Sequence, residues 1–179
     1  MRHFVTLPLL LTLAVPGLIQ AQQTAQPDLS DPQVAHVAVT ANNIDIDLAK
    51  LALTKATNLE VKKFASTMIT DHTAVNQQAS ALAAKLGVTP ADNAVSQSLL
   101  KGASEARAAI EPKSGAAFDR AYIDREVGYH QAVLDALDGL LIPTTSNADL
   151  KKLLVDVRPA IAAHLAHARQ IQGSLGGTR

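Results

Sequence analysis

The stretch TNLEVKKFASTMITDHTAVNQQASALAAKLG, residues 57–87, has the clearest structural pattern in the chain. Its apolar side chains recur at alternating spacings of four and three residues, which is the heptad pattern of a helix packed against other helices. Thr57 and Glu60 form a Thr-x-x-Glu capping box that predicts the start of this helix, and Gly87 predicts its end. The core-facing positions are Val61, Ala65, Met68, His72, Val75, Ala79, Leu82 and Leu86. A histidine, His72, therefore occupies the middle of a core-facing seam.

Helical periodicity also dominates on both sides of this stretch, and no useful strand-like alternation is present. Short turns join the first two and the last two long helices, whereas the second and third are joined by a long connection that contains a shorter helix. Pro159 falls inside the last helix. The sequence therefore predicts an all-α, ferritin-like four-helix bundle with a short crossover helix between helices 2 and 3. The helices are expected over residues 34–56 (or 40–56), 57–86, 94–110, 116–141 and 147–172.

The N-terminus has the pattern of a secretory signal peptide. Arg2 and His3 precede an apolar stretch over residues 4–15, and Ala21 supplies a small residue for cleavage. The apolar stretch is shorter than the roughly 20 residues of a membrane span, and no later segment is apolar enough to be one. A transmembrane segment is therefore not expected in the mature chain. The predicted organisation is a signal peptide over 1–21, a flexible leader over 22–36, the bundle domain over 37–172 and a flexible tail over 173–179.

Composition restricts the classes of function. The 179 residues include 16 basic and 16 acidic side chains, and this balance argues against a nucleic-acid partner. There is no cysteine, which excludes thiolate catalysis and cysteine-ligated metal sites. No ordered set of nucleophile and base and no glycine-rich phosphate loop is present, so the sequence argues against an enzyme. An alanine-rich bundle is able to form a homodimer through an exposed face, but the sequence identifies neither that face nor another protein partner.

Several ionisable residues fall on or beside core-facing positions of different predicted helices. Counted from the predicted turns, they lie at similar heights near the middle of the bundle. Buried ionisable groups are costly unless they are paired, hydrogen-bonded or bound to a metal, so we expect these side chains to meet. The candidate metal ligands are His72, His130, His164, Glu126 and Asp45, and the expected outer partners are Asp71, Asp119 and Tyr122.

Two interpretations of this cluster remain open at the level of sequence. Imidazole and carboxylate ligands converging from several helices suit zinc, iron or copper. Di-iron bundles use Glu-x-x-His pairs, but Ile69, Val127 and Ile161 stand three residues before the three histidines, so di-iron ferroxidase chemistry is not expected. Alternatively, the histidines, carboxylates and Tyr122 hydroxyl form a structural hydrogen-bonded network without a cofactor, which fixes the helix register. The protein is then a non-catalytic structural or stress-related envelope protein.

Three segments together resemble a known bacterial family of exported proteins, the domain of unknown function family 4142. They are KLALTKATNLEVKKFASTMITDHTAVNQQ (residues 50–78), FDRAYIDREVGYHQAVL (118–134) and RPAIAAHLAHA (158–168). The resemblance covers about residues 37–172 and implies a ferritin-like fold and a periplasmic location. It implies no particular activity. Family members usually carry glutamate at the position of Asp45, so the shorter carboxylate is a departure of this chain.

Overall fold

The computed structural model describes residues 28–176, which form helices without any strand. The all-α prediction is confirmed, with five long helices and a short helical segment after the fourth. The predicted signal peptide over residues 1–21 lies outside the described residues. Within the described part, no helix is long and apolar enough to cross a membrane. The elements are α1 (Asp31–Lys55), α2 (Leu59–Leu86), α3 (Ala94–Ile110), α4 (Gly115–Ala136), a π-helical segment η1 (Leu137–Leu141), α5 (Ile142–Thr144) and α6 (Ala148–Gly176).

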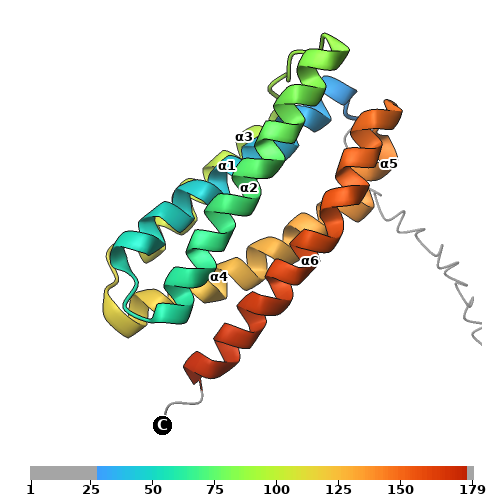
Figure 1. The fold of residues 1–179 in the computed structure, drawn as a ribbon. Coiled ribbons are helices and arrows are strands. Elements are labelled where there is room, and N and C mark those ends of the chain that lie inside the picture. Colours follow the sequence, from blue (N-terminus) through green and yellow to red (C-terminus); the bar gives the residue numbers. More distant parts are fainter. Residues whose placement is uncertain (1–27, 177–179) are drawn as a thin grey trace, which may run out of the picture.

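Helices α1, α2, α4 and α6 surround the core (Figure 1). Helix α1 packs against α2, and α4 packs against α6; contacts of α2 with α6 and of α1 with α4 join the two pairs. Each pair is antiparallel, because a short connection reverses the chain between its members (Figure 1). Helix α3 packs against α1 and α4 and buries only Ser96 and Ile110. The structure therefore confirms a helix over residues 94–110, and this helix contributes little to the core.

The core consists of two apolar clusters. One surrounds Phe64 and Phe118, and the other surrounds Leu134 and Leu154. Burial of each large apolar side chain stabilises the fold by about 1.5–3 kcal/mol, so these clusters hold the four helices together. Along α1 and α4, buried polar residues lie between the two clusters, and they include Asp45 and His130.

The start of α2 differs from the prediction. Asn58, and not Thr57, is the N-cap residue, and its Oδ1 accepts hydrogen bonds from the backbone N–H groups of Glu60 and Val61. Thr57 instead donates its hydroxyl to Asp119 Oδ2 at 2.6 Å and its backbone N–H to Asp119 Oδ1 at 3.0 Å. A hydrogen bond to a carboxylate is stronger than one between neutral groups, which explains why the Thr57–Glu60 capping box does not form.

The ends of the bundle are more ordered than the sequence predicts. Helix α1 begins at Asp31, so residues 31–36 of the predicted leader are helical, and Val34 is fully buried in the core. Helix α6 continues to Gly176, into the predicted tail, and contains Pro159 as predicted. Pro32 lies in the first turn of α1, where its missing N–H costs nothing. Apolar burial and this favourable proline position explain the earlier start of α1.

Candidate metal centre

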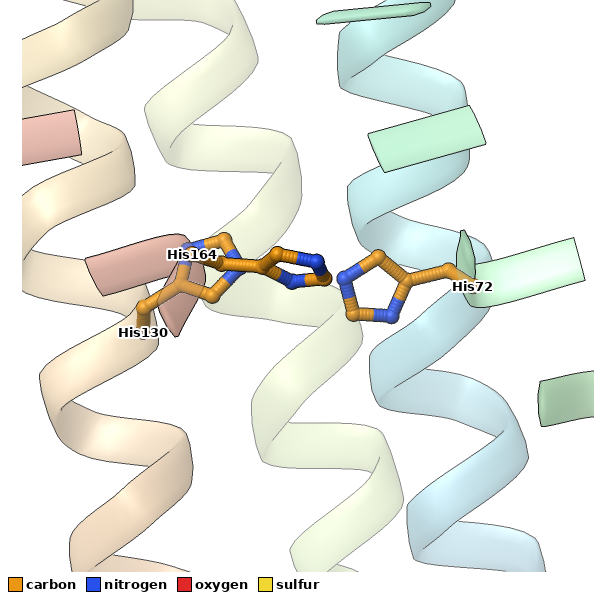
Figure 2. Close-up of side chains that lie close together, drawn as sticks. All are labelled: His72, His130 and His164. Atoms are coloured by element: carbon orange, nitrogen blue, oxygen red, sulfur yellow. The ribbon is translucent and has the colours of Figure 1, made fainter. Parts of the chain in front are cut away.

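Three buried imidazole rings meet between α2, α4 and α6. Figure 2 shows His72 reaching in from one side, and His130 and His164 from the other. The ring centroids of His72 and His164 lie 5.3 Å apart, those of His130 and His164 lie 5.4 Å apart, and those of His72 and His130 lie 5.9 Å apart. All three residues are buried. The structure therefore brings together the three histidines that the sequence analysis predicted to meet.

Each imidazole is oriented by a hydrogen bond from one of its two nitrogens to an oxygen acceptor. A carbonyl or carboxylate oxygen only accepts, so the bound ring nitrogen must carry the proton and donate. The other nitrogen of a neutral ring then presents a lone pair, which is how protein sites prepare histidine for a metal ion. The three bonds are His72 Nδ1 to Asn42 Oδ1 (2.8 Å), His130 Nδ1 to the Glu126 backbone oxygen (3.0 Å) and His164 Nε2 to Asp71 Oδ2 (2.9 Å).

The remaining ring nitrogens are buried and have no hydrogen-bond partner. They are Nε2 of His72, Nε2 of His130 and Nδ1 of His164. One nitrogen from each ring lies within 4.8 Å of the others. Burial lowers the pKa of His164, and the neighbouring His72 and His130 lower it further. Buried nitrogens without partners are costly. His72 Nε2 has a carboxylate oxygen, Asp45 Oδ2, 3.0 Å away, and a single cation between the three rings would satisfy the other two nitrogens as well as this pair.

Two fully buried carboxylates adjoin the histidines. Asp45 Oδ2 lies 3.0 Å from His72 Nε2 and 3.9 Å from His130 Nε2, and Glu126 Oε2 lies 3.4 Å from His130 Nδ1. Burial opposes ionisation of Asp45, but its pKa is lowered because His72, His130 and a nearby arginine outweigh that effect. Burial raises the pKa of Glu126, and the Asp45 charge raises it further. Asp45 is the carboxylate placed beside the Nε2 atoms of His72 and His130, whereas Glu126 lies beside His130 Nδ1.

Two residues of this site, Arg125 and Asn42, were not predicted from the sequence. Arg125 donates from Nη1 to Asp45 Oδ1 at 3.1 Å and to Glu126 Oε1 at 2.8 Å, and its guanidinium stacks on the Tyr129 ring. Asn42 orients His72. A signal for both exists in the spacing. Asn42 stands one helical turn before Asp45, and Arg125 falls at helical spacing between Tyr122 and Tyr129, so both lie on faces that turn inward.

The three expected outer partners have different positions. Asp71 holds His164. The Tyr122 hydroxyl is buried without a hydrogen-bond partner, and its pKa is raised by burial and by the charges of Glu126 and Asp45. Asp119 does not join the cluster: it binds Thr57 and Asn58 in the turn before α2. The sequence could not reveal this, because Asp119 and Glu126 lie two turns apart on the same face of α4.

Comparisons with known proteins give a family and a fold. A family model described as "Domain of unknown function (DUF4142)" matches residues 17–171. None of the curated proteins matches. The solved structure of CopM in a Cu(II)-bound form is similar with a TM-score of 0.62 and 20% sequence identity, covering 82% of this chain and 98% of that one. CopM in an Ag-bound form gives a TM-score of 0.61 and 20% identity, covering 82% and 97%. At this identity the likeness concerns the fold.

Proposed function

This chain belongs to the DUF4142 family, and we propose that it binds one transition-metal ion, Cu(II) foremost, at His72, His130 and His164. One observation carries the proposal. His130 Nε2 and His164 Nδ1 are buried without a hydrogen-bond partner, and His72 Nε2 faces only the carboxylate oxygen Asp45 Oδ2. The opposite nitrogen of each ring is held by an oxygen acceptor. Such outer hydrogen bonds orient metal-binding histidines and fix their tautomers. The proposed ligands are these three nitrogens and Asp45 Oδ2, with Glu126 beside them.

The donor set supports a divalent first-row metal. Imidazole ligands suit zinc, copper, iron and nickel, and Cu(II) binds most tightly among the divalent ions at a site of nitrogen and oxygen ligands. The similarity to CopM, which was solved in Cu(II)-bound and Ag-bound forms, also supports copper. Ag(I) is a soft ion that prefers sulfur ligands, so we expect it to bind here more weakly than Cu(II).

A second candidate function is purely structural. Arg125 pairs with both Asp45 and Glu126, so a large part of the buried charge is balanced within the protein itself. In this alternative the cluster fixes the packing of α1, α2, α4 and α6, and the protein is a non-catalytic envelope protein without a cofactor. In the alternative, Asp45 Oδ2 is the partner of His72 Nε2 at 3.0 Å, but His130 Nε2 and His164 Nδ1 stay buried without a hydrogen-bond partner. For this reason we favour the metal site.

Thermal unfolding in the presence of metals separates the two functions. Purified protein is treated with EDTA, dialysed and melted at neutral pH with and without Cu(II), Zn(II), Fe(II) or Ag(I). A metal that binds only the folded state stabilises it by about 2.7 kcal/mol when its free concentration is 100 times the dissociation constant. We expect the largest increase of Tm with Cu(II). If no metal changes Tm, the metal function is refuted and the structural function is supported.

We further propose that the protein is a ferritin-like four-helix bundle exported to the periplasm. The antiparallel pairs α1–α2 and α4–α6, connected through α3, support this topology. The signal-peptide pattern over residues 1–21 supports export. Intact mass of the protein recovered from the periplasm tests the second part: we expect loss of residues 1–21, and a species that still begins at Met1 would contradict it.

A further inference from the structure

The buried cluster contains two groups of side chains that could each hold a metal ion. One consists of His72, His130 and His164, and the other consists of Asp45, Glu126 and His130. The two groups share His130 and are therefore adjacent. The proposed function uses the histidine group and Asp45. The carboxylate group resembles the kind of site that would accept a second divalent cation, because carboxylate oxygens are good ligands for such ions.

A positive charge already stands at the carboxylate group. Arg125 Nη1 lies 3.1 Å from Asp45 Oδ1 and 2.8 Å from Glu126 Oε1, so one nitrogen bridges the two carboxylates. The Arg125 side chain is only 11% exposed, and its Cζ lies 3.7 Å from the centroid of the Tyr129 ring. The guanidinium is always charged and is held in place by the ring and both acids. A divalent ion between the same carboxylates would be repelled by it.

Arg125 leaves the opposite side of the carboxylates free. Asp45 Oδ2 and Glu126 Oε2 make no contact with Arg125 and lie on the side of the histidines, 3.0 Å from His72 Nε2 and 3.4 Å from His130 Nδ1, respectively. Arg125 thus neutralises one oxygen of each acid and leaves the other directed at the histidine group. The two carboxylates and Arg125 together leave negative charge for one metal ion at the histidines. The positive charge of Arg125 cancels the negative charge that a second metal ion would need.

Arg125 also separates the carboxylates from solvent. A surface cleft of about 520 Å³ between α3 and α4 is lined by Arg125 and Tyr129. A second cleft of about 250 Å³, beside α1, is also lined by Arg125. Shortening this side chain would therefore give ions a route from the surface to Asp45 and Glu126, as well as removing the competing charge.

We infer that Arg125 is the built-in cation of a second metal position, which lies between the carboxylates of Asp45 and Glu126 beside His130, and that it limits the protein to one metal ion. The inference rests on the proposed function for the first ion. It makes Arg125 a residue that determines metal stoichiometry. Replacement of Arg125 by a neutral side chain converts the cluster into a site for two ions.

The test is the number of Cu(II) ions per chain, measured by elemental analysis after dialysis and by calorimetric titration. Arg125→Gln removes the charge, and we expect two ions per chain instead of one. Arg125→Lys keeps the charge and should bind one ion. Arg120→Gln is the matched control, because Arg120 is an exposed arginine of the same helix that pairs with Asp124; it should also bind one ion. The amount of copper bound weakly elsewhere on the surface should be the same in the wild type and the three variants, so it does not affect the comparison.

The outcomes separate this inference from the proposed function. If folded Arg125→Gln binds one ion as the wild type does, or if the wild type binds two, the inference is wrong while metal binding stands. If the wild type binds none, the proposed function fails and so does the limit of one ion; an ion gained in Arg125→Gln alone would then support only the exclusion of a cation from the carboxylates by Arg125, and no ion in either protein would overturn that too. If Arg125→Gln is unfolded without metal, helical circular dichroism is followed during Cu(II) addition. Refolding at two ions supports the inference, and refolding at one ion or none overturns it.

Discussion

At the scale of single residues, Asn42 and Asn43 are adjacent on α1 but only Asn42 contacts the site. Asn42 is buried and accepts from His72 Nδ1, and its amide nitrogen donates to Asn76. Loss of an outer partner of a metal-binding histidine typically reduces metal affinity 10- to 100-fold. We expect that reduction for Asn42→Ala in Cu(II) titrations. Asn43 is exposed and accepts only from Asn76, so Asn43→Ala should keep the affinity of the wild type. Equal affinities in the two variants would contradict the role of Asn42.

The histidines themselves give a second residue-scale prediction. His72→Ala and His164→Ala should each lose most of the bound metal, because each removes one of the three converging nitrogens. Both variants should also lose the metal-dependent increase of Tm, which follows from binding to the folded state. His36→Ala is the control, since His36 lies on α1 beside Ser96 and outside the cluster. Metal retained by His72→Ala at the wild-type level would show that the ion binds elsewhere.

At the scale of elements, Asp119 connects the start of α4 to the turn between α1 and α2. It accepts from Thr57 N, Thr57 Oγ1 and Asn58 N. Asp119→Asn places an amide against these donors, and we expect a loss of about 1–3 kcal/mol of stability, with Tm falling about 2–4 °C for each kcal/mol. Asp135→Asn, at an exposed aspartate of the same helix, should leave Tm unchanged. Cu(II) affinity should be normal in both variants; a selective loss in Asp119→Asn would place Asp119 in the metal site after all.

At the scale of the whole molecule, the two tyrosines report on unfolding at alkaline pH. The chain has two tyrosines and no tryptophan. Burial raises the pKa of Tyr122 well above its usual value, helped by the charges of Glu126 and Asp45. Burial also raises the pKa of Tyr129, although Arg125 opposes this. Because the folded pKa values lie above the unfolded value of about 10, stability is unaffected below pH 10 and falls as pH rises above it.

This linkage predicts a cooperative alkaline transition. The folded protein should show almost no tyrosinate absorbance at 295 nm at pH 11, and the absorbance should appear together with the loss of helical circular dichroism. In Tyr129→Phe, the tyrosinate absorbance should still appear together with the loss of helical circular dichroism. Its amplitude should be half that of the wild type, because Tyr122 is then the one tyrosine that ionises. Gradual ionisation near pH 10 in a protein that remains helical would contradict the raised pKa values of the two tyrosines.

The sequence by itself determined the helices and the inward direction of the polar residues. Helical spacing is a local property, so the seam through His72 and the similar heights of Asp45 and His130 could be predicted from residue order. The same reasoning brought Glu126 and His164 to the cluster, although it placed no bond between any two of them. It failed at the ends of α1 and α2, where burial of Val34 and the reach of Asp119 to Thr57 depend on contacts between distant segments.

Only the tertiary structure decided which oxygen atom accepts a hydrogen bond from which histidine ring nitrogen. Asn42 and Asp71 could be recognised as partners of His72 and His164 only once α1, α2 and α6 were packed. The same holds for Arg125. Its position next to Glu126 in the sequence does not predict its hydrogen bond to Asp45, which is 80 residues away in the chain. Hydrogen bonds and ion pairs require a match of both distance and angle, and packing sets these between helices. The pattern of residues predicted a polar cluster, and the packing of the helices turned it into an oriented site with a cation of its own.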